Sequence, residues 1–125
     1  MISYNEADDI KQKIELIVSA LGFRHINSER LFCIRSYGSK ARGIVARCHS
    51  LPKIMQHSLK INPAYIIEVL SENFDTMSDE QKIKTLIHEL LHIPKTFGGG
   101  FIHHNVVNRR TVEKFYSKYK NLNAD

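Results

Sequence analysis

Two histidines that flank a glutamate at helical spacing are the residues of this chain best suited to chemistry. The segment reads His88-Glu89-Leu90-Leu91-His92. Residues i and i+4 lie on one face of an α-helix, so both imidazoles can reach the same metal ion with the carboxylate beside them. Two neutral imidazoles suit zinc, and the carboxylate can accept a proton from water that the metal activates. The pattern predicts a zinc peptidase site, and the plain alternative is a surface helix with two histidines.

The residues around this segment predict the helix that positions it. Ser78 followed by Gln81 is the pattern of a capping box, and Pro94 ends the helix just after His92. Apolar residues recur between these limits at helical spacing, which predicts a half-buried helix with polar residues at an internal cleft. They are Ile83, Leu86, Ile87, Leu90 and Leu91.

A glycine-rich loop with two histidines follows the helix. Gly98, Gly99 and Gly100 are consecutive and precede His103 and His104. Glycines let the backbone turn sharply, so the loop can carry either histidine beneath the helix as a third zinc ligand. The other histidine could donate a hydrogen bond to substrate. An ordinary flexible loop with exposed histidines is the alternative.

The chain from His88 through Gly100, the histidine after it and segment 109–116 together resemble the small zincin-like metallopeptidases predicted in archaea and phages. The resemblance extends over residues 42–119. In the family pattern the histidine after the glycine loop falls on His104, whereas the position of His103 need not be histidine. The resemblance therefore implies His88, His92 and His104 as zinc ligands and Glu89 as catalytic base. It does not supply the substrate.

The N-terminal half has the pattern of one helix and a small sheet. Apolar residues at helical spacing predict a helix over residues 5–21 that ends at Gly22. Residues 31–36 and 43–49 are rich in apolar and β-branched side chains and flank a turn-like segment. We expect these two strands to form a hairpin.

The second half supplies the remaining elements. Pro52 suits the first turn of a short helix over residues 51–59, and Tyr65–Leu70 has the composition of a strand. By analogy with zincins, this strand would be the sheet edge on which a peptide substrate adds as a further strand. Residues 111–121 predict a C-terminal helix whose tyrosines Tyr116 and Tyr119 are better explained by packing than as oxyanion donors.

Length and composition limit the class of protein. The chain has 125 residues, of which 42% are hydrophobic, as in one compact domain with a modest core. No apolar run approaches the roughly 20 residues that span a bilayer, and the start lacks the order of a signal peptide. We expect a cytoplasmic protein with no membrane contact. Cys33 and Cys48 lack metal-site spacing, which favours two buried thiols over a disulfide.

The positive charge is concentrated in the first half of the chain. The formal net charge is +5, and no Asp or Glu occurs between Arg30 and Ile67. Basic segment 30–60 could bind nucleic acid or acidic proteins, although an ordinary basic surface explains it slightly better. Its cationic residues are Arg30, Arg35, Lys40, Arg42, Arg47, Lys53 and Lys60.

These patterns predict a single α+β domain over residues 1–125, with a minimal zincin-like fold in which a small mixed sheet supports an active-site helix and a C-terminal helix. Its function would be hydrolysis of peptide bonds in a peptide or protein substrate, with Zn²⁺ on His88, His92 and His104 and with Glu89 as base. Two alternatives stay open. One is a zinc-dependent hydrolase of nucleic acid, and the other is a zinc-stabilised module that binds nucleic acid or protein.

Overall fold

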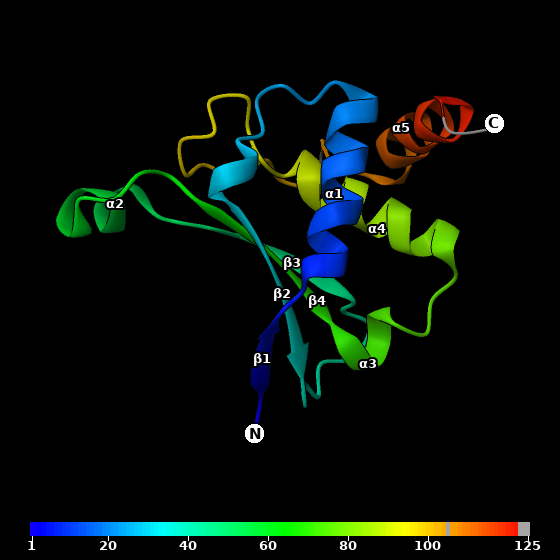
Figure 1. Cartoon of the computed structure of the whole chain (residues 1–125), viewed down its shortest axis with the longest axis horizontal. Coiled ribbons are helices and arrows are strands. Elements are labelled where there is room, and N and C mark those ends of the chain that lie inside the picture. Colours follow the sequence, from blue (N-terminus) through cyan, green and yellow to red (C-terminus); the bar gives the residue numbers. More distant parts are fainter. Residues whose placement is uncertain (105, 123–125) are drawn as a thin grey trace.

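A computed structural model describes residues 1–104 and 106–122 and shows a mixed four-stranded sheet with helices packed on one face (Figure 1). This architecture confirms the predicted α+β class. In chain order the elements are β1 (Ser3–Glu6), α1 (Asp8–Leu21), the 3-10 helix η1 (Ser28–Arg30), β2 (Leu31–Tyr37), β3 (Ala46–Ser50), α2 (Lys53–Leu59), β4 (Tyr65–Leu70), α3 (Ser71–Phe74), α4 (Asp79–Leu91) and α5 (Arg109–Leu122).

The order of strands in the sheet is β1-β2-β4-β3. Strand β4 lies between β2, to which it is parallel, and β3, to which it is antiparallel. The predicted hairpin of residues 31–36 and 43–49 is therefore wrong, and so is the edge position predicted for Tyr65–Leu70. Five of the six residues of β4 are buried, as expected for a central strand covered on both sides by its neighbours.

Strand β3 is the sheet edge next to α4, whereas β1 is the opposite edge. Strand β1 differs from the sequence prediction, in which Asn5 and Glu6 belong to the start of the first helix. All four residues of β1 are exposed, so no apolar alternation marks it in the sequence.

The helix ends follow local signals in the sequence. Gly22 ends α1 in the left-handed conformation, with φ of 67°. The Ser78 side chain accepts a hydrogen bond from the Gln81 backbone N–H at 3.2 Å and caps α4. Helix α5 begins at Arg109, where the Asn108 side chain accepts a bond from the Thr111 backbone N–H at 3.1 Å.

The core lies between the sheet and helices α1, α4 and α5. Ile14 and Ile17 of α1, Ile67 of β4 and Ile87 of α4 are all fully buried in it. On the opposite sheet face Phe32 and Ile66 stay exposed, whereas Ser36 and Glu68 are buried. The main apolar core therefore lies on the face that the helices cover.

The two cysteines lie on different strands of this sheet. Cys33 of β2 and Cys48 of β3 both pair with Ile67 of β4, from opposite sides. They are thus two strand spacings apart, roughly 9.6 Å, which exceeds the reach of a disulfide. Both are free thiols, and Cys33 is buried whereas Cys48 is half-buried, largely as expected.

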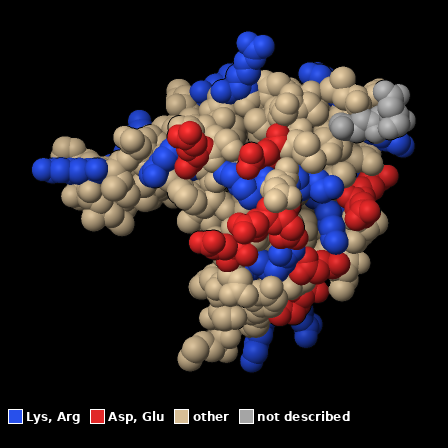
Figure 2. All heavy atoms as spheres, viewed as in Figure 1, with Lys and Arg blue, Asp and Glu red and all other residues tan. Residues whose placement is uncertain are grey.

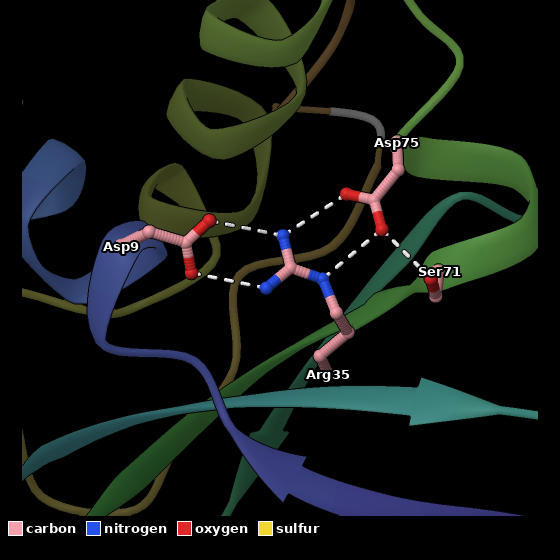
Figure 3. A network of polar contacts seen from close by, with 4 residues as sticks. All are labelled: Asp9, Arg35, Ser71 and Asp75. Carbon is pink, nitrogen blue, oxygen red and sulfur yellow. Dashed lines mark hydrogen bonds and ion pairs between the residues drawn. The ribbon is translucent and has the colours of Figure 1, made fainter.

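A four-residue polar network ties the start of α1 to the sheet (Figure 3). The Arg35 guanidinium donates to both oxygens of Asp9, at 3.0 and 3.1 Å, and to both oxygens of Asp75, at 3.0 and 3.1 Å. The Ser71 hydroxyl donates to Asp75 at 2.7 Å. Hydrogen bonds from Arg35 lower the pKa of Asp9. Burial acts to raise the pKa of Asp75, but bonds from Arg35 and Ser71 outweigh it and lower that pKa too.

We expect Arg35→Met to lower the free energy of unfolding by about 1 kcal/mol at pH 7, since solvent screens both carboxylates. Carboxyl groups with lowered pKa values stabilise the fold above their unfolded pKa and lose this contribution as pH falls through the folded value. The cost of Arg35→Met should therefore shrink below about pH 4. Urea unfolding at pH 7 and pH 3 measures it, with Arg24→Met on an exposed arginine as control. An equal cost at both pH values would contradict this role.

The basic segment does not form one uninterrupted positive surface. Arg35 is paired with two aspartates, and Arg47 lies 3.8 Å from Glu68. Arg30 donates to the backbone carbonyls of Asn62 and Pro63. The face seen in Figure 2 accordingly mixes basic and acidic side chains. The linear stretch without acids is neutralised in part by residues from elsewhere in the chain.

Helix α2 projects away from the rest of the molecule (Figure 1). None of its residues is buried.

Among the described residues, no helix combines the length and the apolar character that crossing a membrane requires.

Candidate metal centre

Helix α4 places His88, Glu89 and His92 at its C-terminal end. The two imidazoles lie one turn apart on one face, as their spacing requires, and their Nε2 atoms are 3.2 Å apart. Two nitrogens bound to one tetrahedral zinc at about 2.0–2.1 Å lie roughly 3.3 Å apart. The separation of the two Nε2 atoms therefore fits a shared metal ion.

The chain after α4 turns back and is fastened to the end of that helix. The Ile102 backbone N–H donates to the His92 carbonyl at 2.8 Å. The Nδ1 atom of His92 in turn bonds to the Ile102 carbonyl. Because Nδ1 must donate to a carbonyl, this bond fixes the tautomer that leaves Nε2 with a free lone pair. Backbone pairing thus orients His92 as a metal ligand requires.

His104 completes a cluster of imidazoles. Its ring centroid lies 4.6 Å from that of His92 and 5.2 Å from that of His88. One ring nitrogen from each of the three histidines lies within 4.8 Å of the others. No other group of three or more potential metal ligands with this geometry occurs within residues 1–104 and 106–122, and His103 is not a member of this one.

The protonation of these imidazoles also suits a metal. Burial lowers the pKa of His88 to about 4, with further contributions from the nearby His92 and His104. Burial likewise lowers the pKa of His92, although its bond to Ile102 acts in the opposite direction. Both rings are therefore neutral at pH 7, which is the form that coordinates metal.

Glu89 lies beside the cluster and is 8% exposed. Burial raises the pKa of its carboxyl group to about 8, although a hydrogen bond with the Cys48 backbone acts to lower it. A buried carboxyl with such a pKa can exchange a proton near neutral pH. Its position can serve proton transfer next to a metal.

An open cleft runs past the cluster between β3, α4 and α5, with a cavity volume of about 1100 Å³. Residues of the edge strand, Ala46 and Cys48 among them, form one wall. Lys84 and Thr85 of α4 and Val112 of α5 also line the cleft. His88, Glu89, His92 and His104 all face the cleft. The cleft can thus hold an extended chain beside the imidazoles.

Comparison with models of protein families decides to which family the chain belongs. A family model described as "Putative phage metallopeptidase" matches residues 2–124. The chain belongs to this phage metallopeptidase family. Comparisons with curated proteins and with solved structures give no match.

Membership in the phage metallopeptidase family confirms the resemblance to phage metallopeptidases. The family description identifies a metal-dependent peptidase, and with it a metal cofactor and a peptide or protein substrate. The cluster of His88, His92 and His104 is able to bind such a metal.

Tyrosines of this phage metallopeptidase do not line the cleft in the part of the chain that the structure describes. The Tyr116 hydroxyl lies 3.5 Å from Glu80, and Tyr119 belongs to the core. Tyr65 is fully buried, yet its hydroxyl bonds to the glycine loop, at Gly99 and Gly100. The sequence patterns missed this contact, because Tyr65 is separated from Gly99 by 34 positions and from Gly100 by 35, and local patterns do not extend that far.

Proposed function

We propose that the protein is a zinc peptidase of the H-E-x-x-H type, in which His88, His92 and His104 hold the ion and Glu89 is the general base. One observation carries the proposal: ring nitrogens of the three histidines lie within 4.8 Å of one another, next to a buried carboxylate in the same cleft. A zinc ion bound there would polarise a substrate carbonyl and lower the pKa of a coordinated water.

The side chains divide the remaining work. Glu89 takes a proton from the attacking water and returns it to the departing amine. Burial raises the pKa of Glu89 to about 8 in the metal-free protein, and the positive charge of a bound zinc ion would lower it again, toward the ionised form that a base needs. The bond from His92 to the Ile102 carbonyl holds its imidazole in one tautomer throughout.

Strand β3 is the element best placed to bind the substrate backbone. It pairs with β4 on one side only, and its residues wall the cleft next to Glu89. An extended peptide can add to such an edge as a further strand, so that main-chain hydrogen bonds hold it whatever its side chains. This arrangement favours an unfolded segment or loop of a protein as substrate.

Metal content and peptide cleavage measured together test the proposal. Protein purified without added metal should contain about one zinc per chain. It should cleave peptides in a proteome-derived library, with new N-termini read by mass spectrometry. A chelator should abolish cleavage, and zinc should restore it.

Two outcomes would overturn this function. Failure to bind zinc even when it is supplied would remove the metal centre. Cleavage of RNA or DNA but not peptides, with a steep dependence on salt, would replace the peptidase by a zinc-dependent hydrolase of nucleic acid.

A further inference from the structure

The Tyr65 hydroxyl holds the middle of the glycine loop. Tyr65 is fully buried at the start of the central strand β4. Its hydroxyl donates to the Gly100 carbonyl at 2.8 Å and accepts a bond from the Gly99 backbone N–H at 2.9 Å. The ring also packs edge-on against Phe97, with centroids 4.8 Å apart. One side chain thus satisfies two polar groups of the loop and contacts a third residue of it.

Gln56 holds the same loop from the other side. Its Nε2 atom donates to the Leu51 carbonyl at 2.8 Å and to the Gly98 carbonyl at 3.1 Å. A Cβ atom at Gly99 would lie 2.4 Å from Gln56 Nε2 and 2.6 Å from the Leu51 carbonyl oxygen. Gly99 also has φ of 103°, which side chains rarely allow. The loop therefore fits tightly between the base of α2 and β4.

This loop connects the two halves of the histidine cluster. It begins after His92 and ends at His104, and between them only Ile102 bonds back to His92. Three consecutive glycines leave such a segment with many accessible conformations, and ordering them upon metal binding costs entropy. Bonds that order the loop beforehand remove part of that cost and strengthen binding.

We propose that Tyr65 is a positioning residue for the metal centre, with Gln56 as its second support. Tyr65 does not contact the metal or the substrate. It acts through the loop, by holding Gly99 and Gly100 so that His104 lies opposite His88 and His92. This proposal rests on the proposed metal function of those histidines. Loss of groups that orient metal ligands typically weakens metal binding 10–100-fold, and we expect about 10-fold because Ile102 stays bonded to His92.

The zinc dissociation constant of Tyr65→Phe tests the proposal. Phenylalanine keeps the ring that packs on Phe97 and removes only the hydroxyl. Zinc affinity is measured by competition with a chromophoric chelator, and for weak sites by titration calorimetry. Tyr4→Phe is the matched control, because Tyr4 lies in the same sheet and is 63% exposed. Both substitutions are made in the parent and in His104→Ala.

The double-mutant comparison separates positioning from general destabilisation. Tyr65→Phe should weaken zinc binding about 10-fold in the parent and hardly at all in His104→Ala, where the loop no longer supplies a ligand. Tyr4→Phe should change neither. Equal losses in both backgrounds, or no loss in the parent, would overturn the proposal. A parent that binds no zinc would instead overturn the proposed function.

Gln56→Leu keeps the proposal testable if Tyr65→Phe does not fold. Gln56 is half-buried on the projecting helix α2, so its replacement leaves the core intact. We expect a smaller loss of zinc affinity that again depends on His104. The visible spectrum of the cobalt-substituted protein should change in the same variants, because it reports ligand geometry rather than stability. An unchanged zinc affinity and an unchanged spectrum in Gln56→Leu would contradict the proposed role of Gln56 in holding the loop.

Discussion

Glu89→Gln should lower kcat/KM about 1000-fold and leave the zinc content unchanged. General bases typically contribute a factor of about 100 to 10,000, and glutamine has nearly the same shape but cannot accept the proton. Glu89 does not belong to the group of three histidines that could hold the metal, so the metal should stay bound. The measurement is the rate of cleavage of a peptide found in the library experiment, together with metal analysis of the same sample.

A matched control separates this effect from loss of charge. Glu15→Gln makes the same substitution at an exposed position of α1, on another part of the fold. It should leave both rate and metal content unchanged. Undiminished hydrolysis by Glu89→Gln would show that another group is the base.

The same variant should also change the stability of the metal-free protein. The folded-state pKa of Glu89 is raised to about 8 by burial, so the folded protein holds this proton over a pH range in which the unfolded chain has lost it. The contribution of Glu89 to the stability of the parent should therefore fall as pH rises from about 4.3 to 8, by an amount on the order of a few kcal/mol. Glutamine carries no such proton, so Glu89→Gln should be the more stable protein above pH 7.

Local patterns were sufficient to predict the helix that carries the chemistry. The cap at Ser78 and the apolar spacing depend only on neighbouring residues, and α4 begins and ends where these signals place it. The same holds for the stop of α1 at Gly22. A short-range pattern is enough wherever the stabilising contacts are themselves short-range.

Strand order could not be obtained in this way. Strands β2 and β3 follow each other in sequence, but both pair with β4, which comes later. The only sequence signal was the nearly continuous apolar run of Tyr65–Leu70, which is typical of a central strand rather than an edge. That run was assigned to the edge by analogy, although its composition indicated the centre.

The choice between His103 and His104 likewise depends on long-range contacts. The side chains of these adjacent histidines point in different directions. Their directions depend on how the backbone of Ile102 pairs with His92. The hydroxyl of Tyr65 fixes the preceding glycines. Spacing alone left both histidines open, whereas the family resemblance favoured His104.

His104→Ala should weaken zinc binding by more than the 10–100-fold that loss of an orienting group typically causes, because it removes a ligand itself. His103→Ala makes the same change one residue earlier and should retain zinc. The imidazole of His104 lies within 5.2 Å of both His88 and His92, centre to centre, whereas His103 stands outside the cluster. Only His104→Ala is therefore expected to remove a zinc ligand.

Metal analysis of both variants, purified beside the parent, distinguishes the possible outcomes. Zinc lost from His104→Ala and kept by His103→Ala would support the proposed ligands. The reverse result would mean that the loop turns its other histidine toward the metal when zinc binds, so that the bond between Ile102 and His92 must be rearranged. Zinc retained by both would leave the two histidines of α4 as the essential ligands, and the glycine loop would then serve the substrate rather than the metal.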